Sequence, residues 1–136
     1  FGYKPGIGRK GRGGEGWYGG SAETSVFEVD RQKVNDLHQT MKPVKLVAGM
    51  LKNSSRESEI VLDGFGGSGT TLIAAEKLAR RARVVELDPV YADVIVQRWQ
   101  EFTGQEAILD AVDKPFTEVK HERTASGTNA PEGPRG

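Results

Sequence analysis

The side chains best suited to chemistry lie between Ile60 and Leu72. In this stretch an apolar run ends at Asp63 and is followed by four glycines, Gly64, Gly66, Gly67 and Gly69. The pattern predicts a strand, a tight loop and a helix starting at Thr70, and backbone N–H groups at such a loop line a ligand site. Three classes of cofactor use a turn of this kind, so the glycines alone leave the ligand open.

Residues around the loop help to separate these classes. Gly64 and Gly69 have the spacing of a nucleotide-binding P-loop, but Thr70 stands where that loop has a lysine. A dinucleotide site matches better, because Gly64-x-Gly66-x-x-Gly69 is its fingerprint and Glu86 stands where an acid should bind ribose. The P-loop interpretation is therefore disfavoured, and the dinucleotide interpretation needs a further test.

Asp63 provides that test. Its carboxylate would face a dianionic pyrophosphate, and like charges about 4–6 Å apart cost on the order of a few kcal/mol at intermediate dielectric. S-adenosylmethionine has an ammonium group and a sulfonium and carries no phosphate. With Asp63 at its cationic end and Glu86 at its ribose hydroxyls, it is the cofactor that fits these residues most simply.

The elements that must position the loop form a β-α-β unit. We expect strands over 59–63 and 82–87, joined by a helix over 70–79. Such a connection requires a parallel pair of strands and a right-handed crossover. The loop then lies at the carboxyl end of the first strand.

Two helices and a strand are expected to flank this unit. Asp88 and Pro89 predict the cap and the first position of a helix that Gly104 ends. Upstream, β-branched and aromatic residues predict a short strand over 24–29, and a helix is expected to begin at Pro43.

Three segments, in order along the chain, resemble DNA amino-methyltransferases, which methylate adenine N6 or cytosine N4. The sequence DGFGGSG over 63–69 resembles their methionine-binding D-x-F-x-G-x-G motif. The sequence HQTMKPV over 38–44 resembles the H-P-T-x-K-P-V segment that precedes it, and ELDPVY over 86–91 resembles the E-x-D-P-x-Y segment that follows. This order is similar to the C-terminal half of the β class, and the resemblance covers roughly residues 26–109.

The resemblance implies a fold and a set of binding residues. The fold class is α/β, a Rossmann-like S-adenosylmethionine-dependent methyltransferase fold that is partial, with about three or four strands of a seven-stranded sheet. The implied cofactor-binding residues are Thr40, Lys42, Asp63, Phe65, Gly67, Gly69, Thr70 and Glu86. Glu86 would bind ribose, Thr40 and Lys42 would close the pocket, and the remaining residues would shape its methionine end.

Departures from the family pattern and structural alternatives accompany this assignment. Gln39 and Gly64 stand where the family commonly has proline, which should weaken pre-organisation of the site without removing it. Some of the residues also have ordinary structural roles open to them. Asp63 could cap the turn, Phe65 could be a core residue, Thr70 could only start a helix and Lys42 could be solvated.

The part of the enzyme that would hold the methyl acceptor is missing. In this family a [D/N/S]-P-P-[Y/F/W] tetrapeptide holds the amine of the flipped base, and no such tetrapeptide occurs in the sequence. Asp88-Pro89-Val90-Tyr91 resembles it superficially but fits a helix start, so no catalytic residue is assigned. We expect a cofactor-binding fragment or one half of a split DNA methyltransferase, with adenine favoured, or else a non-catalytic or decayed S-adenosylmethionine-binding module.

Composition limits the other functions. The chain has 136 residues, no net charge, no cysteine and two histidines, which disfavours a disulfide framework and a metal centre. The sequence shows neither a membrane span nor a signal peptide, so a cytoplasmic protein without a membrane partner is expected.

The ends differ from the middle, and three regions are expected. Residues 1–24 form a glycine-rich basic loop at the end of a DNA-facing region, residues 25–110 the S-adenosylmethionine-binding domain, and residues 111–136 a disordered tail. Double-stranded DNA would bind through a missing N-terminal half, with residues 1–20 as a further contact. A homodimer or a complementing chain remains open.

Overall fold

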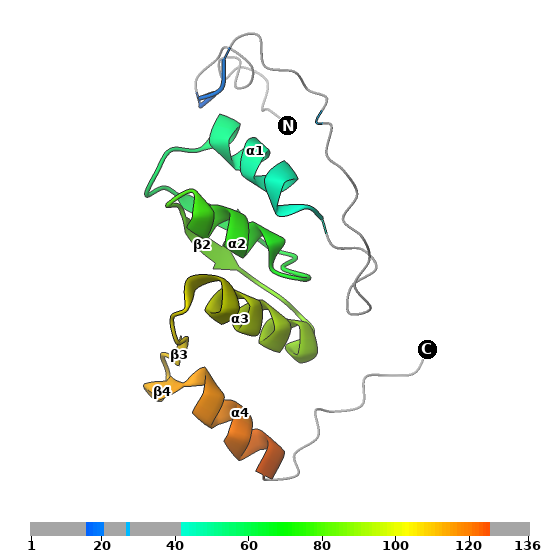
Figure 1. Cartoon of the computed structure of the whole chain (residues 1–136), viewed down its shortest axis with the longest axis vertical. Helices are drawn as coiled ribbons and strands as arrows, with labels where there is room; N and C mark the ends of the chain where they lie inside the picture. Colours follow the sequence, from blue (N-terminus) through cyan, green and yellow to red (C-terminus); the bar gives the residue numbers. More distant parts are fainter. Residues whose placement is uncertain (1–15, 21–26, 28–41, 126–136) are drawn as a thin grey trace, which may run out of the picture.

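The computed structural model of this protein describes residues 16–20, Phe27 and residues 42–125. In these ranges the elements are α1 (Val44–Ser54), β1 (Ile60–Asp63), α2 (Thr70–Lys77), β2 (Arg81–Val84), α3 (Pro89–Thr103), β3 (Ile108–Leu109), β4 (Lys114–Pro115) and α4 (Phe116–Ala125). Figure 1 shows the four helices following one another along the long axis, with β2 between α2 and α3. The expected strand over 24–29 lies outside the described residues except for Phe27.

The β-α-β unit is confirmed. β1 and β2 pair in parallel, with Ile60 opposite Arg81 and Asp63 opposite Val84. β2 ends earlier than the predicted strand over 82–87, because its partner β1 stops at Asp63. The backbone N–H of Val85 still donates to the Asp63 carbonyl at 2.9 Å, after which the chain leaves the ladder.

α1 packs along α2 and differs from the sequence prediction at its first residue. Pro43 has extended backbone angles and precedes the helix as its N-cap, so the first helical residue is Val44. Gly49, which weakens helix propensity, lies under the ring of Phe27. A Cβ at Gly49 would come within 3.2 Å of Phe27 Cε1, so the glycine makes room for an aromatic side chain from a distant part of the chain.

The core lies around α2. Ala74 and Ala75 are fully buried, and Ile73 of α2 and Ile95 of α3 are nearly so. Small side chains on α2 let its neighbours approach closely, while the longer aliphatic side chains fill the space that remains. α2 is therefore the central helix of the layer that supports the glycine loop.

α3 follows the predicted signals at both ends. Asp88 Oδ1 accepts a hydrogen bond from the backbone N–H of Val90 at 2.8 Å, and Pro89 occupies the first turn. Gly104 ends the helix in the left-handed conformation with φ +69°. Both caps are local in sequence, which is why they were predictable.

The expected disordered tail needs correction over 111–125. The chain forms the antiparallel pair β3–β4 and then α4. Lys114 pairs with Glu118 and Glu122, and the Thr117 hydroxyl donates to Glu106 Oε1 at 2.6 Å. Polar contacts of this kind support a helix with few apolar residues, so hydrophobic periodicity did not reveal it.

One face of the β1–β2 pair is uncovered among the described residues. Ile60 and Leu62 alternate onto this face, and Leu62 is 76% exposed. Arg81 and Arg83 of β2 lie beside them in the same register. Parallel sheets are normally covered on both faces, so this sheet has the character of part of a larger one.

The described residues contain neither a membrane-spanning helix nor a cluster of metal ligands. No described helix combines the length and the apolar character that a membrane span requires. Nor does any group of three or more histidine, aspartate or glutamate side chains in the described part of the chain form a candidate metal site.

Candidate functional site

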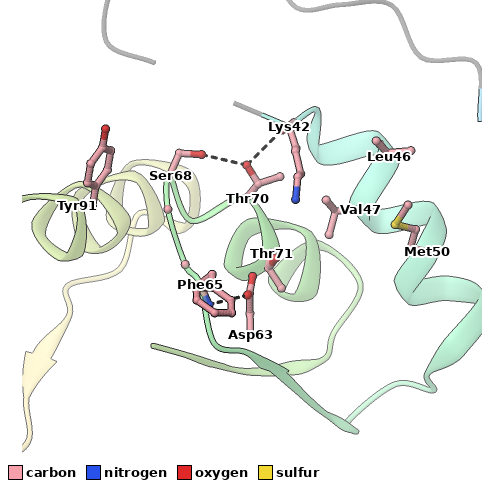
Figure 2. Close-up of a pocket in the computed structure, with 12 residues that line it drawn as sticks. Lys42, Leu46, Val47, Met50, Asp63, Phe65, Ser68, Thr70, Thr71 and Tyr91 are labelled. Carbon is pink, nitrogen blue, oxygen red and sulfur yellow. Dashed lines mark hydrogen bonds between the residues drawn. The ribbon is translucent and has the colours of Figure 1, made fainter. Parts of the chain in front are cut away.

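A pocket of about 540 Å³ lies between α1 and the glycine loop (Figure 2). Its walls come from α1, from the loop after β1, from the first turn of α2 and from α3. The lining residues are Lys42, Leu46, Val47, Met50, Asp63, Phe65, Gly66, Gly67, Ser68, Thr70, Thr71 and Tyr91. Five of the eight predicted residues therefore line one cavity, and Gly69 lies between the lining residues Ser68 and Thr70.

The loop has its shape because of Gly66 and Gly69. Gly69 has φ +77°, and a Cβ there would lie 3.1–3.3 Å from three atoms of Ile95. A Cβ at Gly66 would come within 2.6 Å of Val84 Cγ1 and 2.7 Å of Ile95 Cδ1. Only glycine allows α3 to support the loop this closely.

Asp63 and Phe65 form one side of the pocket (Figure 2). Asp63 Oδ1 accepts a hydrogen bond from the backbone N–H of Phe65 at 3.0 Å, so Asp63 does cap the turn. It also borders the cavity, and the two roles coexist. Phe65 is 93% exposed, so it is not part of the core that the described residues form.

Thr70 and Lys42 join the loop to α1. The buried Thr70 hydroxyl donates to the Lys42 carbonyl oxygen at 3.2 Å and lies 3.3 Å from Ser68 Oγ. Thr70 is therefore more than the first residue of a helix. Lys42 is exposed at the edge of the pocket, whereas Thr40, the other residue expected there, lies outside the described part of the chain.

Glu86 lies beside the loop and is not among the lining residues of the pocket. Its Oε2 accepts from the backbone N–H of Gly67 at 2.6 Å, and its Oε1 accepts from that of Asp88 at 3.0 Å. The bond from Asp88 and then that from Gly67 lower the pKa of the carboxyl below its ordinary value. The carboxylate is thus held ionised and oriented next to the loop.

This arrangement predicts an acid-dependent loss of stability. A carboxyl with a lowered pKa stabilises the folded state above its ordinary pKa of 4.5, and that stability is lost as the pH falls through the lower folded value. Glu86→Gln does not titrate and should lose less stability than the wild type between about pH 6 and pH 3. Thermal unfolding across this range measures the difference, and parallel curves for both proteins would contradict the prediction.

Several contributors to the site were missed from the sequence. Leu46, Val47 and Met50 of α1 line the pocket, and none of them was among the residues predicted for the site. Tyr91 lines it from α3, and its signal was its place in the E-x-D-P-x-Y segment. Arg98 of α3 donates from Nη1 to the Ser68 carbonyl oxygen, and no local pattern marks that contact.

The chain has clear relatives. The profile of a DNA methylase family, the N6/N4 methyltransferases, matches residues 15–97. The type II methyltransferase M.HinfI of Haemophilus influenzae is 38% identical over 78 residues, which are 57% of this chain and 22% of that protein. M1.MboII of Moraxella bovis is 35% identical over 80 residues, or 59% and 30% of the two chains.

A solved structure shows the fold. M1.HpyAVI in complex with S-adenosylmethionine aligns with a TM-score of 0.51 at 22% identity, over 61% of this chain and 43% of that one. The present structure is thus part of an α/β methyltransferase fold. The chain spans between 22% and 30% of the length of the curated relatives it matches.

Proposed function

Since this chain belongs to the DNA methylase family, we propose that it carries the S-adenosylmethionine site of an enzyme that methylates an exocyclic amino group of DNA. The observation that carries the proposal is Asp63, a carboxylate at the edge of a pocket formed by a glycine loop. An ammonium group about 4 Å from such a carboxylate gains about 4 kcal/mol at an effective dielectric of 20, and a pyrophosphate would be repelled to a similar degree. The methyl donor with a cationic amino-acid end is therefore favoured over NAD.

Different predicted residues would bind different parts of the cofactor. Asp63, Phe65, Gly67, Gly69 and Thr70 would hold the methionine end. The pocket position of Asp63 and Phe65, the glycine conformations and the buried Thr70 hydroxyl support this assignment. When bound, the cofactor supplies an electrophilic methyl group on sulfur, and these side chains orient it.

The other predicted residues would hold the nucleoside and close the pocket. Each Glu86 oxygen accepts a backbone hydrogen bond and has further lone-pair capacity, so it can still accept from ribose hydroxyls. Lys42 and Thr40 would close the pocket from the side of α1, and the exposed position of Lys42 at its edge supports this for Lys42.

The acceptor site would lie on a part of the protein that this chain does not supply. The sequence contains no [D/N/S]-P-P-[Y/F/W] tetrapeptide, and the uncovered face of β1–β2 is consistent with further strands and helices of the same fold. We favour adenine N6 over cytosine N4 as the target. A non-catalytic or decayed S-adenosylmethionine-binding module is the second candidate, favoured by the same missing tetrapeptide.

The partners follow from this proposal. Double-stranded DNA would bind through the complementary part of the enzyme, with the basic residues of 1–20 as a further contact. That part would be a complementing chain or a longer form of this one, and a homodimer is an alternative. The cytoplasm is the proposed location.

Calorimetry with S-adenosylmethionine and with NAD tests the ligand. We expect S-adenosylmethionine to bind more tightly, and Asp63→Asn to weaken its binding by about 10- to 100-fold, since a charged contact contributes roughly 1.5–3 kcal/mol. Asp110→Asn, an exposed carboxylate between β3 and β4, is the matched control and should bind as the wild type does. Tighter NAD binding, or no loss of S-adenosylmethionine binding in Asp63→Asn or Glu86→Ala, would refute the assignment.

A further inference from the structure

One face of α3 supports the glycine loop along its length. Tyr91, Ile95 and Arg98 follow one another at i, i+4 and i+7 and so share a side of the helix. Tyr91 borders the pocket, and Ile95 lies against Gly66 and Gly69. Arg98 completes the row, because its Nη1 donates to the carbonyl oxygen of Ser68, a pocket residue.

We propose that Arg98 is a positioning residue for the cofactor, which acts by holding the Ser68 carbonyl and thereby fixing the peptide group between Ser68 and Gly69. The inference rests on the proposed function and assigns Arg98 a role in that site. Arg98 is not one of the residues that line the pocket, so its effect passes through the loop.

The mechanism follows from peptide planarity. Because a peptide group is rigid, a hydrogen bond to the Ser68 carbonyl also sets the direction of the Gly69 N–H. That N–H donates to the Gly66 carbonyl at 2.8 Å, which closes the turn. With Arg98 in place, the turn is fixed from α3 immediately before Thr70, at the methionine end of the proposed site.

A second side chain holds the same loop as a hydrogen-bond acceptor, whereas Arg98 is a donor. Glu86 accepts from the N–H of Gly67, one residue before the carbonyl that Arg98 holds. The acceptor Glu86 and the donor Arg98 thus fix two consecutive loop residues, Gly67 and Ser68. Both side chains come from outside the glycine motif. Pre-organisation of this kind lowers the cost of ordering a loop when its ligand binds.

The surroundings of Arg98 support the role. Burial lowers the pKa of its guanidinium, and the neighbouring Glu101 opposes this shift. The group stays charged, because arginine is not deprotonated in proteins. A partly buried guanidinium needs acceptors for its N–H groups, and the Ser68 carbonyl is one of them. The contact therefore satisfies a donor of Arg98 and at the same time holds the loop.

The test compares two ligands that share a nucleoside. S-adenosylmethionine carries the amino-acid end, whereas 5′-methylthioadenosine lacks its ammonium and carboxylate. In the full 136-residue chain, Arg98→Met keeps a long apolar stem and removes the donors. We expect it to weaken the binding of S-adenosylmethionine about tenfold and that of methylthioadenosine by less than about twofold. Tenfold is the lower end of the range of about 10- to 100-fold for residues that orient a binding site without contacting the ligand. Arg98→Lys, which keeps a charged donor, should recover part of the loss.

Trp99→Phe is the matched control. Trp99 Nε1 donates to Glu76 Oε2 at 3.1 Å, so it links α3 to α2 away from the loop. We expect it to lower the unfolding temperature without changing the ratio of the two dissociation constants. An unchanged ratio in Arg98→Met, or an equal change in Trp99→Phe, would overturn the inference and leave the proposed function intact. Failure of the unaltered chain to bind S-adenosylmethionine would instead overturn the proposed function and the inference with it.

Discussion

Gly69→Ala is expected to lower the free energy of unfolding by about 2–5 kcal/mol and to abolish measurable S-adenosylmethionine binding. A left-handed conformation costs a residue with a Cβ about 1–2 kcal/mol, and overpacking adds about 1–3 kcal/mol. Both penalties apply, because Gly69 has φ +77° and its new Cβ would lie 3.3 Å from the backbone Cα of Ile95. The loop would have to move away from α3, and the pocket would lose the wall that the loop residues form. Urea unfolding and calorimetry measure the two effects.

Gly64→Ala is the matched control within the same loop. Gly64 has no positive φ, and a Cβ there would meet nothing within 4 Å. The substitution should leave binding unchanged and alter stability by less than about 1 kcal/mol, with a gain expected from the reduced freedom of the unfolded chain. If the two alanine variants behave alike, the loop is not held against α3 as described.

The second large effect concerns the reaction. This 136-residue chain should bind S-adenosylmethionine and yet transfer no methyl group to duplex DNA above background, because it contains no tetrapeptide that would hold the acceptor amine. Incorporation of tritiated methyl into DNA measures the reaction, where an active enzyme exceeds background by many orders of magnitude. Transfer by residues 1–136 alone would show that the acceptor site has been misplaced.

A chimera tests the same prediction from the opposite direction. The matched 78-residue segment of the Haemophilus influenzae relative can be replaced by the corresponding part of this chain. We expect methylation to be retained in part, and to be lost when Asp63→Asn is introduced into the chimera. Activity that survives Asp63→Asn would place the cofactor elsewhere, whereas an inactive but folded chimera would favour a decayed module.

Much of the fold could be predicted because its signals are local. The apolar run before Asp63, the glycines after it and the Asp88-Pro89 cap each define an element within a few residues. These signals gave β1, α2 and α3 with boundaries correct to within two residues. The pocket side chains of the loop were predictable for the same reason, since the motif that carries them is contiguous.

What the sequence did not reveal depends on distance along the chain or on polar contacts. Arg98 reaches a carbonyl 30 residues away, and Glu86 meets an N–H 19 residues away, so no pattern within either segment marks those bonds. The pocket side of α1 was hidden because the same helix also packs on α2. α4 was missed because ion pairs of Lys114 support it in place of an apolar stripe.

The pocket has a further property that concerns how it forms. All its lining residues fall between Lys42 and Tyr91, so the segments that meet there are separated by short connections. Closing short loops costs little chain entropy, and proteins rich in such local contacts fold quickly. We therefore expect the cavity to assemble early during folding, from one continuous stretch of chain, before more distant parts of the polypeptide have found their places.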